Sequence, residues 1–321
     1  MKAYLMRIAV LALGALYVAT APAQYPVWPI KLLVPISAGG APDVAARVPG
    51  QKLAESMGQQ IVVENRTGSN GNIAADLVAK SPADGYTLLL APDSLFTLNP
   101  HLYAKMPFDP LVDLVAVASI ASNQYILSVN PSLPVNNFNE FIEYARRAKP
   151  PLAFASGGNS SGSHLSLEML KARAGIEFVH VPYKGGTPAT TATVAGETAA
   201  TFAGASSAGQ IKAGRLRALA QTSARRSAAF PNLPSVGEIY PGFDVTTWYG
   251  VFAPAGTPEP VLARLRTEVA RVLAHSDLKE RLNAAGGMEP YATKVEEFVA
   301  LMRRDHDRFG KLIKELKISL D

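Results

Sequence analysis

The 321 residues carry a formal net charge of +5 at pH 7 and contain no cysteine. The lack of cysteine excludes a disulfide framework and a thiolate metal site, so stability must come from packing. Charges of both signs are mixed along the chain, and such a mild positive excess is not typical of a nucleic-acid-binding protein. The length is sufficient for two domains, each with an ordinary core.

The first segment, residues 1–23, has the pattern of a cleavable secretory signal peptide. It begins with basic residues, continues through an apolar stretch over residues 8–18 and ends in Ala21-Pro22-Ala23. The apolar stretch is too short to span a bilayer comfortably, so we predict cleavage after Ala23 and export to the periplasm. A buried N-terminal helix or a retained anchor is the alternative. No later segment approaches 18 consecutive apolar residues, and we expect a soluble mature protein.

An apolar run and a small-residue turn follow, and together they are typical of an anion-binding site. The predicted strand Ile30–Val34 leads into Pro35–Asp43, and a helix is predicted from Pro42 to Ser56. Gly39 and Gly40 allow a left-handed backbone and a close approach of a ligand. The first-turn amides of the helix carry the positive end of its dipole, where a carboxylate or phosphate can bind. The alternative is a tight strand-to-helix turn without a ligand.

Asp43 lies in the first turn of this predicted helix. The helix dipole favours a carboxylate there, so a structural role is the favoured interpretation, although the same carboxyl group could act as an acid in a reaction. Arg47 is four residues further along and can pair with Asp43 on one face of the helix.

Apolar and amphipathic segments alternate along the rest of the chain, and the alternation occurs twice. Such an order predicts an α/β fold with mostly parallel sheets flanked by helices. The predicted strands are Ile61–Val63, Tyr86–Leu90, Val115–Ile120, Tyr125–Val129, Leu152–Phe154, Phe178–Val181, Arg217–Ala220 and Thr247–Phe252. The further predicted helices are Asn72–Lys80, Gly162–Ala174, Pro188–Ala195, one with Thr257 as N-cap and Pro258 as first residue, and Lys294–Leu316.

Two crossing points divide the chain into two lobes. A pair of candidate strands forms the first crossing, and a proline-rich segment over residues 231–241 precedes the second. We therefore predict a discontinuous first domain of residues 24–122 plus 246–321, with a second domain of residues 123–245 inserted between its two parts.

The second domain contains a counterpart of the first turn. Residues 155–164 read Ala-Ser-Gly-Gly-Asn-Ser-Ser-Gly-Ser-His and lie between a predicted strand and a predicted helix. In open α/β sheets, ligands bind beyond the carboxyl ends of the strands. Two turns rich in backbone donors and hydroxyl groups would then face each other across one cleft. Hinges near residues 121–126 and 243–248 would absorb its closure.

The same turn contains a formal match to the nucleophile elbow Gly-x-Ser-x-Gly, with Ser160 as the serine. A hydrolase of that kind would also need a histidine late in the chain, but His275 and His306 lie on charged helical segments. A five-residue match arises easily by chance in a loop of glycine and serine, so a secreted serine hydrolase is the less favoured alternative. We expect His164 to be a hydrogen-bonding residue in the first helical turn rather than a base.

Motifs for metal and nucleotide chemistry are missing from the sequence. It has no H-E-x-x-H, EF-hand, Walker A or G-x-G-x-x-G pattern, and its five histidines are scattered. We therefore expect no metal, no cofactor and no enzymatic activity.

A series of short motifs runs in order over nearly the whole mature chain. The motifs are Tyr25-Pro26 with Trp28-Pro29-Ile30, Gly39-Gly40 with Asp43 and Arg47, Glu64–Gly68 with Gly71-Asn72, Asp84–Leu88, Ser163–Leu165 with Glu168, His180–Gly185, Leu233–Ser235 with Glu238, Pro241–Phe243, Trp248 with Gly250, and Ala253–Pro258. Each motif is modest alone. The ordered series is highly specific, and it resembles the Bug family, the periplasmic solute receptors of tripartite tricarboxylate transporters.

The resemblance implies a two-lobed periplasmic binding protein, similar to type II, that closes on a small organic acid and delivers it to membrane transporter subunits. In that family, the turn that matches Ser37–Gly40 holds one ligand carboxylate through main-chain amides and bridging water. The other end of the ligand meets the second lobe. The candidate ligand-binding residues are Ile36, Ser37, Ala38, Gly39, Gly40, Asp43, Ser94, Ser156, Gly157, Asn159, Ser160, Ser161, His164, Lys184, Thr187 and Ser206.

The expected ligand is a mono-, di- or tricarboxylate, bound by a monomer that does not bind nucleic acid. A receptor that senses a carboxylate for signalling is an alternative to a transport receptor. Ile36 stands where an aromatic residue is common in the family, and Pro42 where threonine is common, so we expect a less aromatic and stiffer first turn. Residues 196–200 also depart from the family's usual run, which weakens the case for an amino acid as ligand.

Overall fold

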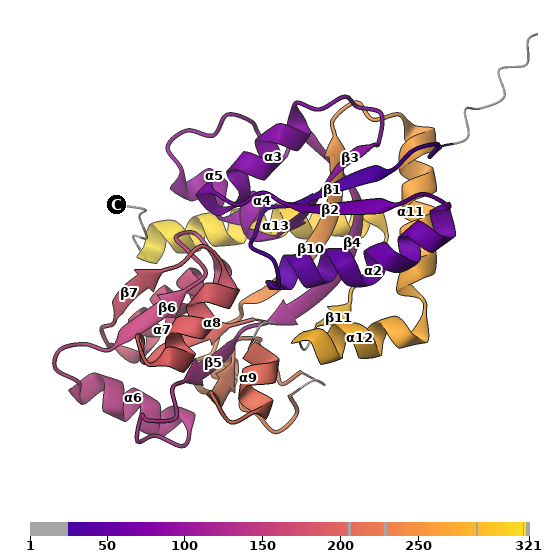
Figure 1. Cartoon of the computed structure of the whole chain (residues 1–321). Coiled ribbons are helices and arrows are strands. Elements are labelled where there is room, and N and C mark those ends of the chain that lie inside the picture. Colours follow the sequence, from indigo (N-terminus) through magenta and orange to yellow (C-terminus); the bar gives the residue numbers. More distant parts are fainter. Residues whose placement is uncertain (1–24, 205–206, 228–229, 287, 317, 319–321) are drawn as a thin grey trace, which may run out of the picture.

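The computed structural model describes residues 25–204, 207–227, 230–286, 288–316 and 318. They form two lobes, and each lobe is one sheet flanked by helices (Figure 1). The two-lobed α/β fold predicted from the sequence is therefore confirmed. The predicted signal peptide lies outside the described residues.

Lobe 1 is built from both ends of the described chain. Its elements before the crossing are β1 (Ile30–Val34), α2 (Ala41–Met57), β2 (Ile61–Asn65), the 3₁₀ turn η1 (Ser69–Gly71), α3 (Asn72–Ala79), β3 (Thr87–Pro92), α4 (Ser94–Thr97), α5 (Asn99–Leu102) and β4 (Leu114–Gln124). Its elements after the return are β10 (Thr246–Pro254), α11 (Glu259–Leu273), α12 (Ser276–Gly286), β11 (Glu289–Pro290) and α13 (Val295–Leu316).

Lobe 2 is built from the middle of the chain, and the chain enters it at Tyr125, directly after β4. Its elements are β5 (Ile126–Val129), α6 (Phe138–Arg147), β6 (Ala153–Ser156), α7 (Gly162–Ala174), β7 (Val179–Pro182), α8 (Gly186–Ala195), β8 (Ala200–Ala203), α9 (Ala208–Lys212), β9 (Arg217–Gln221) and α10 (Val236–Ile239). The chain leaves lobe 2 at Val245 and continues into β10.

Both sheets are mixed rather than mostly parallel, which corrects the prediction. The strand order is β11-β4-β10-β3-β1-β2 in lobe 1 and β7-β6-β8-β5-β9 in lobe 2. In lobe 1, β1 pairs in parallel with β2 and β3, whereas β10 is antiparallel to β3 and β4. In lobe 2, β6 is parallel to β7 and β8, whereas β5 is antiparallel to β8 and β9. The reason is that β5 and β10 carry the chain into a lobe, so they run opposite to strands that end at the cleft.

Four elements of lobe 2 were not predicted: α6, β8 and the short helices α9 and α10. The helix α6 begins with Asn137 as N-cap, whose side chain accepts a hydrogen bond from the amide of Glu140, and Glu140 in turn accepts from the amide of Asn136. This reciprocal capping is a readable sequence signal. The strand β8 reads Ala-Thr-Phe-Ala and is buried at every position. Only Thr201 and Phe202 favour a strand, and a run this short gives a weak local signal, so its place between β6 and β5 depends on tertiary packing.

The start of α11 differs from the prediction that Thr257 caps the helix. The N-cap is Pro258, and the helix begins at Glu259. The hydroxyl group of Thr257 donates instead to the carbonyl oxygen of Pro254, at 2.7 Å. Because this bond closes the turn before the helix, the hydroxyl group is not available to the first-turn amides of α11.

Three hydrophobic cores stabilise the molecule, two in lobe 1 and one in lobe 2. One face of the lobe 1 sheet packs against α2, α11 and α12, and the opposite face packs against α3, α4 and α13. Lobe 2 has its own core, but α13 contributes to both lobes: Phe298 and Met302 pack in lobe 1, whereas Phe309 and Ile313 pack in lobe 2. Figure 1 shows this long helix, in yellow, reaching from lobe 1 towards lobe 2. The C-terminal helix is therefore shared by the two lobes.

Candidate functional site

The turn between β1 and α2 is organised by the carboxylate of Asp43. It accepts hydrogen bonds from the Gly39 amide, the Arg47 side chain and the Asn65 side-chain amide, each at 2.9 Å. Burial alone would raise the pKa of Asp43, but the hydrogen bonds from Arg47, Gly39 and Asn65 lower it below its ordinary value. An ionised Asp43 therefore holds the turn from within. Because it occupies the Gly39 amide, that amide is not free to bind a ligand.

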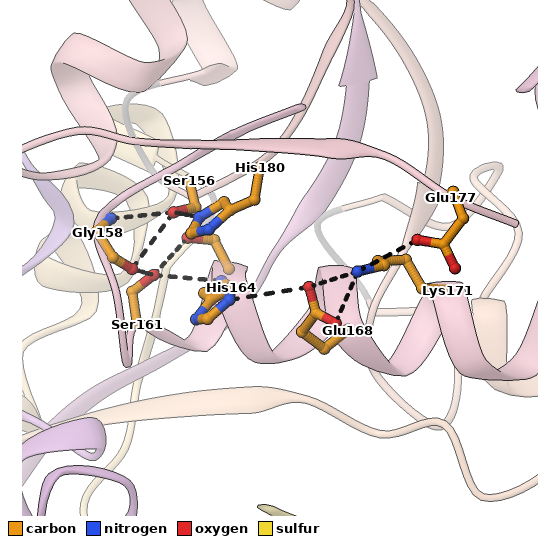
Figure 2. Close-up of polar contacts among 9 residues, drawn as sticks. Ser156, Gly158, Ser161, His164, Glu168, Lys171, Glu177 and His180 are labelled. Carbon is orange, nitrogen blue, oxygen red and sulfur yellow. Dashed lines mark hydrogen bonds and ion pairs between the residues drawn. The ribbon is translucent and has the colours of Figure 1, made fainter. Parts of the chain in front are cut away.

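The turn between β6 and α7 is held by its own serines (Figure 2). Ser161 is the N-cap of α7, and its side chain accepts from the amide of His164 and donates to the carbonyl oxygen of Gly158, at 2.6 Å. The side chain of Ser163 accepts from the amide of Gly157, at 2.9 Å. These bonds shape the turn without using the side chain of the neighbouring Asn159.

Two stacked histidines pack against the second turn and contact it through Ser156. The rings of His164 and His180 stack, with centroids 4.1 Å apart and planes 6° apart, and Nε2 of His180 lies 2.6 Å from Oγ of Ser156. Burial lowers the pKa of each histidine to about 4, and the positive charge of Lys171 contributes to both shifts. Both rings are therefore neutral at neutral pH. Figure 2 shows the stack at the start of α7, where Glu168 lies 3.8 Å from His164.

An inner cavity lies between the lobes, where the two turns face each other. The cavity and its mouth enclose about 560 Å³. Lobe 1 contributes Ile36, Ala41, Pro42, Asn70, Pro92, Ser94 and Tyr249, lobe 2 contributes Gly157, Ser161, Gly162, Ser163, Gly186, Phe202 and Gly204, and Tyr125 lies at the crossing. The described lining residues carry no formal charge at neutral pH, so polar contacts here come from hydroxyl, amide and main-chain groups.

An outer cavity adjoins the inner one and shares Ile36, Asn70 and Gly157 with it. The outer cavity and its mouth enclose about 690 Å³, and the other lining residues are Pro35, Thr67, Gly68, Ser69, Tyr103, Gly158, Asn159, Pro182, Tyr183, Lys184 and Gly185. Among the described residues that line either cavity, Lys184 is the one charged side chain. The described residues of the two linings include no acidic side chain, so the electrostatics of these cavities favour an anion.

The predicted site residues separate into three groups. Those that line the inner or outer cavity are Ile36, Ser94, Gly157, Asn159, Ser161 and Lys184. Ser37, Ala38 and Thr187 line a neighbouring groove together with Tyr183 and Glu197. Gly39, Gly40, Asp43, Ser156, Ser160 and His164 belong to the two turns but are not among the lining residues of these spaces. Ser206 lies outside the described residues.

Several buried polar atoms at the cleft have no hydrogen-bond partner within the described protein. They are Oγ of Ser37, Nδ2 of Asn123, Oγ of Ser160 and Oγ1 of Thr187. A buried polar group without a partner costs free energy, so these atoms are suited to contacts with a polar ligand or its water. The unpartnered hydroxyl of Ser160 also lacks the histidine that a hydrolase would need, whereas the serine that contacts a histidine is Ser156.

Aromatic residues of the inner cavity were missed by the sequence reasoning. Tyr249 lies in β10, and its hydroxyl group donates to Oδ1 of Asn123, at 2.9 Å. Tyr125 lies so close to the start of α7 that a β-carbon at Gly162 would stand 2.7 Å from its hydroxyl oxygen. Phe202 reaches the cavity from β8. No local motif marks these residues, because Tyr249 and Phe202 come from strands whose partners lie far along the sequence, and Tyr125 lies at the crossing between β4 and β5.

A buried carboxyl group lies directly below the inner cavity. Asp93 stands between the lining residues Pro92 and Ser94 and accepts a hydrogen bond from Thr247. Burial raises its pKa to about 7; the hydrogen bond from Thr247 opposes this rise, and nearby Asp305 adds to it. At pH values below about 7, Asp93 is therefore neutral and adds no negative charge to the cleft.

Two further searches of the described residues were negative. No helix in this part of the chain is both long and apolar enough to cross a membrane. No cluster of three or more histidine, cysteine, aspartate or glutamate side chains in it could hold a metal ion.

Comparison with protein families and curated proteins gives consistent matches. Residues 45–318 match the model of the tripartite tricarboxylate transporter family receptor. The protein BugT of Bordetella pertussis is 35% identical over 294 residues, which cover 91% of this chain and 90% of BugT.

Solved structures give the same picture at the level of the fold. A Rhodopseudomonas palustris protein with adipate is 34% identical, has a TM-score of 0.89, and the match covers 92% of this chain and 99% of that one. MatC from Rhodopseudomonas palustris with bound malate is 28% identical, has a TM-score of 0.83, and the match covers 90% of this chain and 100% of MatC. The turns described above therefore belong to a fold that binds dicarboxylates in two similar proteins.

Proposed function

The chain belongs to the tripartite tricarboxylate transporter receptor family, and we propose that it captures a small organic carboxylate between its lobes and delivers it to such a transporter. Receptors of this family are periplasmic binding proteins rather than enzymes. The mechanism is closure of the two lobes, which removes the ligand from water and strengthens its hydrogen bonds.

The charge of the cleft is the observation that carries this proposal. The inner and outer cavities lie between two turns rich in hydroxyl and amide groups, and their described lining residues include Lys184 but no carboxylate. Unpartnered buried polar atoms of Ser37 and Thr187 stand nearby. Such a site favours an anion that can accept several hydrogen bonds, and a carboxylate does so. The two similar proteins with adipate and malate support the same ligand class.

The proposed ligand contacts follow from the positions of the side chains. We assign Ser94 and Asn159 as polar contacts and Lys184 as the cationic contact, with Ser37 and Thr187 acting directly or through water. Asp43 and His164 hold their turns instead of the ligand. Export with cleavage after Ala23 and a monomeric state remain part of the proposal.

Isothermal titration calorimetry against a panel of acids tests the proposal. The panel contains acetate, benzoate, malate, adipate and citrate, with adipamide as the uncharged control for adipate. We expect one or more acids to bind and adipamide not to bind, because the cleft recognises the carboxylate. Lys184→Ala should weaken binding by about tenfold, since a charge-assisted hydrogen bond is worth about 1.5 kcal/mol or more. Lys279→Ala changes an exposed lysine of α12 and should leave the affinity unchanged.

Binding of none of the acids, together with tight binding of a sugar or a cation, would overturn the proposal. Equal affinity in the Lys184→Ala and Lys279→Ala variants would retain a carboxylate receptor but remove Lys184 from its site.

A further inference from the structure

A hydrogen bond crosses the cleft between the two lobes. The side-chain amide nitrogen of Asn70, in lobe 1, donates to the carbonyl oxygen of Ser160, in lobe 2, at 2.9 Å. Asn70 lines both the inner and the outer cavity, so its side chain stands at the boundary between them. This hydrogen bond would therefore lie between a ligand in the inner cavity and the outer cavity.

The side chain of Asn70 is held in place by its own lobe. Its amide nitrogen also donates to Oδ1 of Asn99, at 2.8 Å. Asn99 is fully buried, and its own amide nitrogen donates to the carbonyl oxygen of Asn70 and to Oδ1 of Asn72. The donor is thus oriented from lobe 1 alone, and little conformational entropy is lost when lobe 2 arrives.

Both partners of the crossing bond have an unusual backbone conformation. The φ angle is +46° at Asn70 and +59° at Ser160, in the left-handed region that residues other than glycine rarely adopt. Such conformations cost free energy and persist where the surrounding structure demands them. Here they point an amide and a carbonyl oxygen at each other across the cleft.

Other hydrogen bonds between the lobes lie close to the crossing points. Arg308 of α13 donates to the carbonyl oxygen of Asp244, at 2.7 Å, and Gln124 donates to Oγ of Ser227, at 2.5 Å. Asp244 and Gln124 directly flank the segments that connect the lobes, so rotation about those segments displaces them little. The contact of Asn70 lies at the cavities instead and must break when the cleft opens.

We propose that Asn70 is the latch of the cleft, a positioning residue whose amide holds the lobes closed over the ligand and slows ligand release. This inference rests on the proposed function because it concerns the same cleft. It assigns to Asn70 a contribution to the closed state rather than to the recognition of one particular acid.

Single-molecule fluorescence energy transfer measures the closed state directly. The chain has no cysteine, so Lys80→Cys near the end of α3 and Arg147→Cys at the end of α6 give unique labelling sites. These helices lie at opposite ends of the molecule (Figure 1). Trajectories are recorded for the free protein and with adipate or malate, and stopped-flow mixing gives the rates of binding and release.

Three variants separate the latch from a general structural role. Asn70→Gly keeps the left-handed backbone and removes the amide, whereas Asn70→Asp keeps the shape and removes the donor. Both should shorten the closed-state lifetime of the free protein by about fivefold. Asn70→Gly should speed release of a bound acid equally, with the association rate unchanged, whereas the negative charge of Asn70→Asp in the cleft should also slow association of the acid. Asn130→Ala removes a similar bond to the carbonyl oxygen of Thr193 within lobe 2 and should change neither rate.

An unchanged closed-state lifetime in both Asn70 variants would overturn the latch, even if their free energy of unfolding falls. A wild-type protein that never closes, alone or with either acid, would overturn it as well. Failure of every carboxylate to bind would refute the proposed function, but the lifetimes of the free protein would still test the latch.

Discussion

Two carboxyl groups beside the cleft show how their surroundings decide the charge of a side chain. Asp43 accepts three hydrogen bonds and has a lowered pKa, so it is ionised and holds the first turn. Asp93 is buried with one side-chain donor, Thr247, and its pKa rises to about 7. The difference is that burial dominates at Asp93, which also lies near the carboxyl group of Asp305, whereas Asp43 lies beside the positive charge of Arg47.

The raised pKa of Asp93 predicts a specific dependence of stability on pH. Between about pH 4 and pH 7, the folded protein keeps a proton on Asp93 that the unfolded chain releases. The free energy of unfolding should therefore fall as pH rises through this range, and level off above it. Asp93→Asn is neutral at every pH, so it should remove this fall and gain on the order of 2 kcal/mol over the wild type between pH 4.5 and pH 8.

Urea denaturation of the wild type and the variant at pH 4.5, 6 and 8 checks this prediction. Asp307→Asn, at an exposed position on α13, is the control and should follow the wild type at each pH. Parallel curves for the wild type and Asp93→Asn would show that Asp93 titrates alike in the folded and unfolded states.

At the scale of elements, the strand-to-helix turns decide how closely the lobes can approach. Gly185 precedes α8 with a φ angle of +125°, and a β-carbon there would stand 2.7 Å from Oγ of Ser37 and 3.2 Å from Ile36. Ser37 and Ile36 belong to the first turn, in lobe 1. The absence of a side chain at Gly185 thus allows the turn before α8, in lobe 2, to contact the turn before α2, in lobe 1.

Gly185→Ala should hold the lobes apart and weaken ligand binding by about tenfold, because the closed state must absorb an overpacked contact. Gly175→Ala is the matched control: it also places alanine at a left-handed position, but nothing lies within 4 Å of its β-carbon. Both variants should lose about 1 kcal/mol of stability from backbone strain. Calorimetric titration with the tightest-binding acid of the panel and urea denaturation measure the two effects. Equal affinities in the two variants would contradict the steric account.

At the scale of the whole molecule, α13 joins the two lobes into one cooperative unit. Its Phe298 packs in the core of lobe 1 and its Phe309 in the core of lobe 2, and both rings are almost fully buried. A rigid helix anchored at both ends transmits the loosening of one core to the other. We therefore expect the lobes of the wild type to unfold together.

Phe309→Ala should cost about 3 to 5 kcal/mol and separate the unfolding of the lobes. Both tryptophans, Trp28 and Trp248, belong to lobe 1, so their fluorescence reports that lobe, whereas circular dichroism reports the whole chain. In Phe309→Ala the dichroism should change at a lower urea concentration than the fluorescence. Phe298→Ala loosens lobe 1 instead and should bring the fluorescence change first. Coincident transitions in both variants would contradict this role of α13.

Much of the fold and part of the site followed from local patterns. The turns around Ile36 and Gly157 were placed at the cleft because each follows an apolar run and precedes a helical pattern. Their neighbours across the cleft, Tyr125, Tyr249 and Asn70, carry no such pattern. Tyr249 reaches the inner cavity through the pairing of β10, Asn70 through a 3₁₀ turn, and Tyr125 through its place at the crossing between the lobes, and these positions depend on residues far away in the sequence.

The sequence by itself determined the two-lobed α/β fold, the family and the two turns that face each other, because these depend on the order of short-range signals. Only the tertiary structure decided which donors of the first turn stay free. The carboxylate of Asp43 accepts the hydrogen bond of the Gly39 amide, and Asn65, 22 residues away, donates a further hydrogen bond to the same carboxylate. The structure also decided the mixed sheets, the buried Asp93 and the bond from Asn70 to Ser160, 90 residues apart. Burial and long-range contacts set these features, and neither can be read from neighbouring residues.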